Sequence, residues 1–357
     1  ARAVTPTGPA GQLARVASPH ATLATLGEGG VIAALGRQGL AGPPGALGIG
    51  DDAALVPLGH PGVVASVDTL VEGVHFRLAT TTPEDLGWKV LAVNLSDLAA
   101  MGARPVAVLL ALSAPASLPA RWVEGLAAGL HALAARHGVW LAGGDTTGSP
   151  GPVVVSVTAL GEPGPGGRVL TRAGARPGDV VFTTSRPGLA GAGLLALEHP
   201  AAMAGLPAGL VAEACEAHRR PCPHVAAGLA LAALTTRLAL LDDSDGLARS
   251  AQLLAEGASA GVVLEAARLA LAPATRAIAA AHGHDPLALA LHGGEDYGLV
   301  GACAAEAWPH VAQTLAAEGF PGQRVGRVEA SCRGAWVEAA GELTPLTGAA
   351  GHAHFGG

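Results

Sequence analysis

Lysine is almost missing from this chain of 357 residues, in which Lys89 is the only one against 20 arginines. Charged residues of all kinds make up only 14% and hydrophobic residues 50%, so a sizeable core can form and global disorder is excluded. The excess of Ala, Gly and Arg is typical of a biased nucleotide composition. The lone Lys89 and the acidic residues therefore carry more information than any single Ala, Gly or Arg.

Other scarcities exclude whole classes of protein. The four cysteines form no CxxC pair, which argues against a zinc site and favours free thiols in a reducing cytoplasm. The longest charge-free runs, of about 16 residues, are interrupted by Pro, Gly or Ser and fall short of a membrane helix, and the first residues lack the apolar core of a secretory signal. The net charge of −7, with no basic stripe, argues against nucleic acid as a partner.

Well-known catalytic motifs are missing too. The chain has no GxxxxGK[ST] loop, no GxGxxG followed by a strand lysine, no GxSxG and no HExxH. If phosphates bind here, metal ions and carboxylates must bridge them in place of a backbone cradle.

The length suggests two domains at roughly 150 residues each, and we expect a boundary near the Gly/Pro-rich linker Gly161–Gly167. Hydrophobic periodicity predicts α/β (α+β) architecture throughout. The expected helices of the first half are Leu23–Gln38, Pro83–Ala100 and Leu118–His137. The expected strands of the same half are Val63–Val67, Leu70–Phe76, Pro105–Leu112, Val139–Ala142 and Pro152–Leu160, and the last two flank a polar loop.

Acidic residues gather in six clusters beside glycine. A single Asp in such a place can be a turn residue or a helix N-cap, and Asp245 is as well explained as a cap as it is as a ligand. Grouped carboxylates, however, repel one another unless cations neutralise them, and oxygen ligands without Cys or His favour Mg²⁺. The clusters are GIGDDAAL (Asp51, Asp52), SVDTL (Ser66, Asp68), NLSDLAAMG (Asp97), GGDTTG (Asp145), LLDDSDGL (Asp242, Asp243, Asp245) and GGEDYG (Glu295, Asp296).

Local geometry supports a metal-lined site. On a strand, Ser66 and Asp68 project from one face. On the helix, Lys89 and Asp97 share a face about 12 Å apart. Among the 14 histidines we favour His75 for function because it follows Asp68 closely, and we expect the others to be structural or exposed.

With these motifs in place, the chain resembles the thiamine-monophosphate kinase family, a member of the superfamily that includes aminoimidazole ribonucleotide synthetase. Residues 1–20 lie outside the resemblance. The motifs that carry it follow one another along about residues 48–357: GIGDDAAL, SVDTLVEGVHF, DLGWKVLAVNLSDLAAMGARP, GGDTT, LTRAGARPGD, HRRPCP, DDSDGL, GGEDY and GHAHF.

The resemblance implies transfer of the γ-phosphoryl group of ATP to thiamine monophosphate, with several Mg²⁺ ions per site and no covalent catalytic residue. It implies an N-terminal extension (1–45), an N-terminal ATP- and metal-binding domain with a mixed sheet (46–165) that pairs into a homodimer, and a C-terminal α/β domain (166–357), with the active-site cleft between the two. The implied metal ligands are Asp52, Ser66, the carbonyl of Val67, Asp68, Asp97, Asp145, Asp242 and Asp245. The implied nucleotide contacts are Gly144, Asp145, Arg172 and Ser244, and the implied substrate contacts are His75, Glu295 and His352.

Two departures from the family stand out. His352 occupies the position where family members often carry a stacking aromatic residue, and Asp243 stands where the family usually has an uncharged one. Two alternatives remain open: another ATP-dependent enzyme of the superfamily, or a non-catalytic Mg-nucleotide-binding module. Selenophosphate synthetase needs a reactive Cys or selenocysteine near the N-terminus, and the hydrogenase maturation dehydratase needs a C-terminal Cys. Here the first cysteine is Cys215 and the tail reads GHAHFGG, which weakens both.

Overall fold

The computed structural model describes Gly45, Ala54–Val56 and residues 62–346. All of them fall within one compact unit of the chain, Gly42–Gly351. The expected helix Leu23–Gln38 lies outside the described residues, and the domain boundary expected near residue 165 stays a prediction. No helix in the described part of the chain is both long and apolar enough to span a bilayer.

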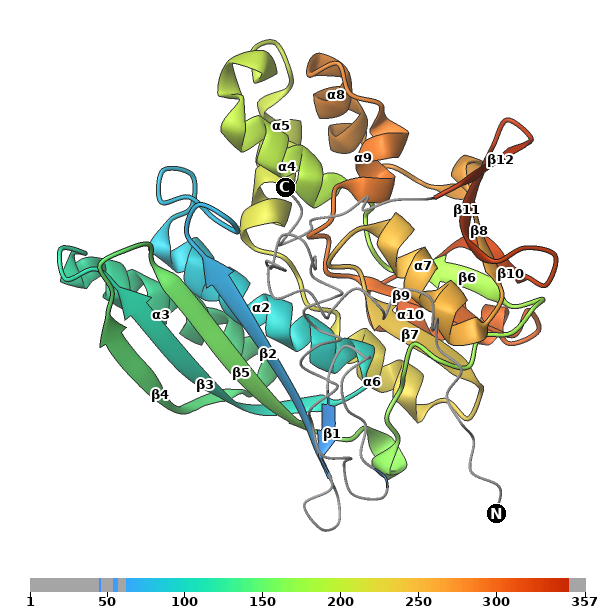
Figure 1. The fold of residues 1–357 in the computed structure, drawn as a ribbon, viewed down its shortest axis with the longest axis horizontal. Helices are drawn as coiled ribbons and strands as arrows, with labels where there is room; N and C mark the ends of the chain where they lie inside the picture. The colour runs from blue at the N-terminus through green and yellow to red at the C-terminus, as the bar shows by residue number, and fades with distance from the viewer. Residues whose placement is uncertain (1–44, 46–53, 57–61, 347–357) are drawn as a thin grey trace, which may run out of the picture. The chain divides into compact units, whose positions relative to one another are not determined.

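The first sheet has five strands in the order β1-β2-β5-β3-β4, and all its neighbours are antiparallel except the pair β3 and β4. Two helices, α2 (Pro83–Ala100) and α3 (Ala120–His137), lie along one face of it (Figure 1). The strands are β1 (Ala54–Val56), β2 (Val63–Val71), β3 (Arg104–Ala114), β4 (Trp140–Gly148) and β5 (Val154–Glu162).

The opposite face of this sheet has no helix over it among the described residues. Val67 and Leu109 are both paired with Thr158 of β5, so all three side chains project from that face. Val67 is 63% exposed and Leu109 41% exposed, which is unusual for large apolar side chains in the middle of a sheet. We call the surface around these three residues the open face.

The second sheet has seven strands in the order β12-β11-β8-β10-β6-β9-β7. Its strands are β6 (Val180–Thr183), β7 (Leu238–Asp242), β8 (Gly261–Glu265), β9 (Leu299–Cys303), β10 (Gln323–Glu329), β11 (Gly334–Ala339) and β12 (Glu342–Pro345). The helices of this half are α4 (Leu189–Glu198), α5 (Ala208–Arg219), α6 (Val225–Ala233), α7 (Leu247–Ala258), α8 (Pro273–Ala281), α9 (Pro286–His292) and α10 (Trp308–Ala317). Together with the first sheet, this confirms the predicted α/β (α+β) fold class.

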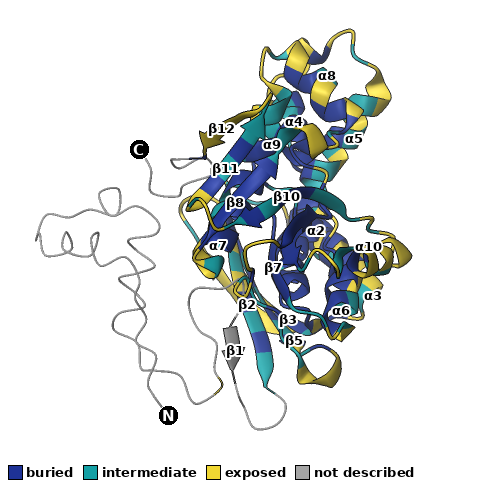
Figure 2. Ribbon diagram, turned by 90° about the vertical axis from the view of Figure 1, so that its right-hand side faces the viewer, coloured by how far each residue is buried: buried dark blue, intermediate teal, exposed yellow. Residues whose placement is uncertain are grey.

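Helix α2 connects the two sheets. It begins where the side chain of Thr82 accepts a hydrogen bond from the Asp85 amide at 3.1 Å, with Pro83 at the first helical position, and it ends at Met101. The helix contacts β2 and β5 on one side and α6, β7 and β9 on others, so it is buried almost all round (Figure 2). Its polar side chains therefore lie inside the protein, some toward the first sheet and others toward the second.

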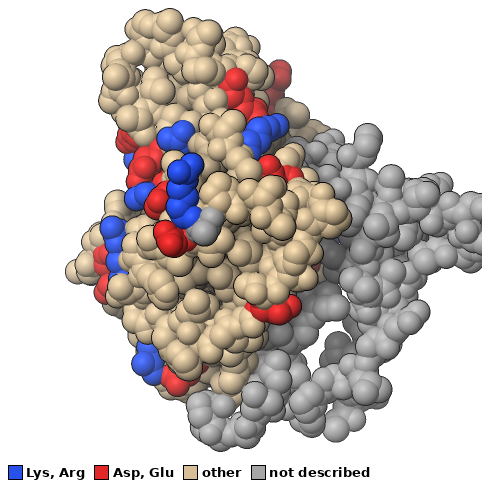
Figure 3. Space-filling model, turned by 90° about the vertical axis from the view of Figure 1, so that its left-hand side faces the viewer, with Lys and Arg blue, Asp and Glu red and all other residues tan. Residues whose placement is uncertain are grey.

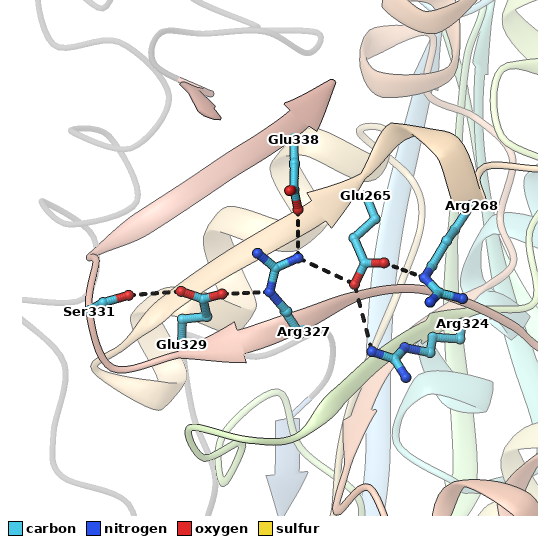
Figure 4. A network of polar contacts seen from close by, with 7 residues as sticks. All are labelled: Glu265, Arg268, Arg324, Arg327, Glu329, Ser331 and Glu338. Atoms are coloured by element: carbon cyan, nitrogen blue, oxygen red, sulfur yellow. Dashed lines mark hydrogen bonds and ion pairs between the residues drawn. The ribbon is translucent and has the colours of Figure 1, made fainter. Parts of the chain in front are cut away.

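Charged side chains elsewhere are mostly paired at the surface. One network crosses β8, β10 and β11, where Arg327 contacts Glu265, Glu329 and Glu338 (Figure 4). On the face shown in Figure 3, acidic and basic side chains lie beside one another and much of the surface carries neither. No basic stripe crosses that face.

Several predicted elements need correction. The expected strand Val63–Val67 continues to Val71 as β2, whereas most of the expected strand Leu70–Phe76 is wrong, because residues 73–75 form a turn after β2. The expected polar loop after Ala142 is part of β4, which pairs in parallel with β3 from Trp140 to Gly148 after one bulge. Glycines suggested a turn there, but the ladder to β3 supplies the hydrogen bonds that keep this segment extended.

Candidate functional site

The first part of the site joins β2 to α2. Ser66 and Asp68 project from the helix-covered face of β2, as their spacing predicted, and the Ser66 hydroxyl donates a hydrogen bond to Asp97 on α2. Asp68 also shares a hydrogen bond with Asp97. A hydroxyl and two carboxylates, far apart in sequence, thus meet between the sheet and its covering helix.

The surroundings of Asp68 disfavour its ionised form. Burial raises the pKa of Asp68 to about 6, the hydrogen bond with Asp97 opposes that rise, and the charge of Asp245 adds to it. Near pH 7 the site therefore concentrates negative charge in a poorly solvated place. A divalent cation would relieve this repulsion.

The second part lies at the end of β7 and the start of α7. The Ser96 hydroxyl of α2 donates to Asp242 at 2.9 Å, and Ser244 lies 3.4 Å from the other oxygen of the same carboxylate. The interpretation of Asp245 as a helix cap is wrong: Gly246 occupies the N-cap of α7 and no side chain caps it. The charge of Asp245 acts instead on Asp68, which places it near the oxygen donors of the first part.

Asp243 faces away from this cluster into the core. It is fully buried and accepts a hydrogen bond from Ser250 at 3.1 Å, and burial raises its pKa to about 6. This hydrogen bond links the β7–α7 loop to α7, on which Ser250 lies.

The third part is the GGEDYG segment before β9. Its backbone is bonded to the β7–α7 loop, because the Glu295 amide donates to the Ser244 carbonyl and the Tyr297 amide to the Asp243 carbonyl. Asp296 points away and accepts hydrogen bonds from the backbone amides of Gly188 and Ala190 at the start of α4. Glu295 is the residue of this segment that turns toward α2.

Glu295 meets two residues that sequence reasoning did not assign. The ammonium of Lys89 lies 2.8 Å from its Oε1, and Nδ1 of His218 lies 3.1 Å from its Oε2. Sequence analysis placed Lys89 on the ligand-bearing face of the helix without a partner, and treated His218 as structural. The scarcity of lysine was the signal in the sequence that singled out Lys89.

His75 follows β2 directly. Its Nδ1 accepts a hydrogen bond from the Val71 amide at 3.0 Å, so a neutral ring carries its proton on Nε2. Arg172 lies beside β7, since the carbonyl of the preceding Thr171 accepts from the Leu240 amide. The strand that carries Asp242 at its end therefore runs next to Arg172.

Asp145 is not brought to this cluster within the chain. It pairs with Ala111, which pairs with Ser156, which pairs with Thr69, so Asp145 projects from the open face. Asp68 projects from the other face and lies three strands away, roughly 14 Å at the usual spacing. Gly144, one residue earlier, lies on the same face of the sheet as Asp68. The exposed side chain of Val67 projects from the open face, so only its backbone carbonyl lies near Ser66 and Asp68.

Two assigned residues, Asp52 and His352, lie outside the described residues. Within residues 62–346, no three acidic, His or Cys side chains already converge as a metal cage. Mg²⁺ usually binds through one or two carboxylates plus waters and substrate phosphates, so the oxygen donors of Ser66, Asp68 and Asp97 fit that ion without such a cage.

Comparisons with known proteins cover nearly all of the described chain. Residues 50–162 match the family model of the AIR synthase related protein N-terminal domain, and residues 176–337 match that of the C-terminal domain. A thiamine-monophosphate kinase from Bacillus subtilis is 35% identical over 315 residues, which is 87% of this chain and 93% of that protein.

Solved structures agree with these sequence matches. AaThiL complexed with AMPPCP and TMP superposes with a TM-score of 0.78 at 29% identity, covering 92% of this chain and 97% of that one. Thiamine-monophosphate kinase from Stenotrophomonas maltophilia superposes with a TM-score of 0.72 at 36% identity, covering 88% and 96%.

Proposed function

The chain belongs to the thiamine-monophosphate kinase family of AIR synthase related proteins, and from this we propose that it transfers the γ-phosphoryl group of ATP to thiamine monophosphate. The products are thiamine diphosphate and ADP. The observation within the chain that carries the proposal is the meeting of Ser66, Asp68 and Asp97 with the charge of Asp245. Three segments distant in sequence bring oxygen donors and excess negative charge to one place, as phosphoryl transfer from a triphosphate to a monophosphate with bound cations requires.

The chemistry asks for positioning more than for a reactive side chain. The acceptor oxygen belongs to a phosphate and is already anionic near neutral pH, so it needs no general base. Mg²⁺ held by the carboxylates would neutralise charge between the triphosphate of ATP and the phosphate of the acceptor. The protein's share is to hold both substrates in line, and the described site offers no residue that must be phosphorylated on the way.

The roles of individual residues follow from their places. We assign the metals to Asp52, Ser66, the Val67 carbonyl, Asp68, Asp97, Asp145, Asp242 and Asp245; the nucleotide to Gly144, Asp145, Arg172 and Ser244; and the acceptor to His75, Glu295 and His352. ATP is the co-substrate, and the nucleotide analogue AMPPCP in the related AaThiL complex supports this choice.

The open face supports a homodimer. Val67 and Leu109 expose apolar side chains at the centre of a sheet that no described helix covers on that side. Two copies joined through this face would cover it, as expected for an isologous pair. They would also give Asp145 a way to take part, because it projects from the open face and cannot reach Asp68 in its own chain.

We place the enzyme in the cytoplasm. All four cysteines are free thiols, as expected in a reducing compartment.

An assay of ADP release across phosphate acceptors tests the function. With ATP and Mg²⁺, we expect many turnovers that depend on thiamine monophosphate, and little ADP with free thiamine or other monophosphates. A non-catalytic Mg-nucleotide module would bind ATP but release no ADP in a thiamine-monophosphate-dependent way. Turnover with a different acceptor would instead point to another enzyme of the superfamily.

A further inference from the structure

Lys89 is a buried charge with one carboxylate as its partner. Its side chain is only 2% exposed, and its ammonium lies 2.8 Å from Oε1 of Glu295. A buried ammonium is strongly unfavourable unless an opposite charge and hydrogen bonds compensate it. Removing Glu295 would therefore leave the Lys89 ammonium buried without its opposite charge. The pair also links α2 to the segment before β9.

Glu295 is held at its backbone as well as at its carboxylate. Its φ is +59°, in the left-handed region that residues other than glycine rarely occupy, and its amide donates to the Ser244 carbonyl at 2.6 Å. His218 on α5 approaches the second carboxylate oxygen at 3.1 Å. Contacts from α2 and α5 thus hold the Glu295 carboxylate, while the β7–α7 loop holds its backbone.

This arrangement also fixes the charges. Burial works to raise the pKa of Glu295, but the ammonium of Lys89 and the contact with His218 hold it well below its usual range. Burial, with the nearby charge of Lys89 and a smaller contribution from Arg219, lowers the pKa of His218. Glu295 is then an anion beside a neutral imidazole at neutral pH.

The carboxylate keeps capacity for a ligand. Each of its oxygens can accept a second hydrogen bond, and a quarter of the side chain remains exposed. Lys89, by contrast, is enclosed and cannot touch a bound substrate. Glu295 can therefore contact a bound substrate, whereas Lys89 can only hold Glu295 in place.

We propose that Lys89 and His218 are positioning residues that fix the Glu295 carboxylate for the phosphoryl acceptor. The proposal rests on the proposed function, in which Glu295 contacts thiamine monophosphate. Lys89 acts through Glu295 and not on the nucleotide or the metals.

The test is a cycle of Lys89→Met, Glu295→Gln and the double variant, with KM measured for both substrates. Lys89→Met should raise KM for thiamine monophosphate about tenfold or more, since a charge-assisted contact is misplaced, and leave KM for ATP nearly unchanged. In the Glu295→Gln background, Lys89→Met should add no further rise. Independent, multiplying rises would overturn the proposal.

A pH profile separates positioning from loss of packing. Without the Lys89 ammonium, only the contact with His218 opposes the effect of burial, so the pKa of Glu295 should rise. The acceptor role needs the anion, so KM for thiamine monophosphate in Lys89→Met should fall as pH rises through that raised pKa. The parent enzyme should show no such change across the neutral range. Leu95→Met, a buried apolar substitution on the same helix, controls for packing and should show no pH dependence of its own.

Folding failure of Lys89→Met would not end the test. The double variant removes both charges and can be compared with Glu295→Gln, while His218→Asn probes the second contact; a KM for the acceptor unaffected by His218→Asn would remove His218 from the proposal. If Glu295→Gln leaves that KM unchanged, the acceptor role of Glu295 itself is wrong. If Glu295→Gln raises it and Lys89→Met does not, only the positioning proposal fails.

Discussion

Asp68 takes its chemistry from its surroundings. An Asp on a strand is ordinary, but here burial raises its pKa to about 6 while Asp97 shares a hydrogen bond with it and Asp245 repels it. Without a cation, a proton must balance part of this charge; with Mg²⁺ bound, the ion does so. The family resemblance predicted that Ser66, Asp68 and Asp97 are metal ligands, and the structure brings their side chains together.

We predict that Asp68→Asn lowers kcat by about 10²-fold or more at saturating Mg²⁺, because one ligand charge at the reacting centre is lost. The fold should survive, since Asn has nearly the same shape. ADP release together with a thermal unfolding curve measures both effects. Asp285→Asn is the matched control, because Asp285 caps α9 and Asn can cap equally well. Near-normal turnover of Asp68→Asn would remove this residue from the metal site.

The end of β2 orients His75, because its Nδ1 accepts a hydrogen bond from the Val71 amide. We predict that His75→Ala raises KM for thiamine monophosphate more than KM for ATP, because Nε2 serves the acceptor. His75→Asn can keep the contact to Val71 but lacks Nε2, so it should behave like the alanine variant. An equal rise in both KM values would place His75 outside the acceptor site.

At the scale of elements, local signals predicted α2 to the residue. Pro83, Glu84 and the spacing of its apolar residues predicted its start and course, and α3 ends at Gly138 as expected. What periodicity could not show is that α2 is buried on nearly every side, because that depends on which elements pack against it. The partners of Lys89 and Ser96 are equally long-range and equally invisible in the sequence.

The segment before β9 depends on the loop beneath it. Gly294 has φ +64°, and a Cβ there would stand 2.9 Å from the Ser244 carbonyl oxygen. Both this loop and the one before α7 carry assigned site residues, so the contact between them positions Glu295 against Ser244.

We predict that Gly294→Ala separates these loops and lowers kcat/KM about a hundredfold. Gly283→Ala is the control: its φ is +73°, but nothing lies within 4 Å of the added Cβ. Both variants should lose about 1–2 kcal/mol of unfolding free energy from backbone strain, and Gly294→Ala should lose more from crowding. Urea unfolding and kinetics measure both; equal activity of the two variants would contradict a role for this contact.

For the whole molecule, the sequence and its family resemblance predicted the fold class, but they did not predict which face of the first sheet carries Asp145. GGDTTG suggested a ligand loop, whereas the structure extends it as edge strand β4 with Asp145 on the open face. The register that decides this arises from pairing with β3, which no local pattern encodes.

We predict that Leu109→Asp, a charge on the open face, converts a dimer to a monomer and also abolishes activity, although Leu109 lies across the sheet from Asp68. Leu343→Asp is the matched control, an exposed leucine on β12 of the other sheet. Light scattering and ADP release are the measurements. A fully active monomer would show that the site is complete in one chain.

The central claim is that the γ-phosphoryl group passes directly from ATP to thiamine monophosphate. ATP made chiral at its γ-phosphorus tests this claim most directly, because a single in-line displacement inverts the configuration at phosphorus and a phosphoenzyme route retains it. Direct transfer predicts thiamine diphosphate with inverted configuration at the transferred phosphorus. Retention of configuration, or a labelled phosphoenzyme formed at a competent rate without acceptor, would contradict direct transfer and make His75 a candidate nucleophile.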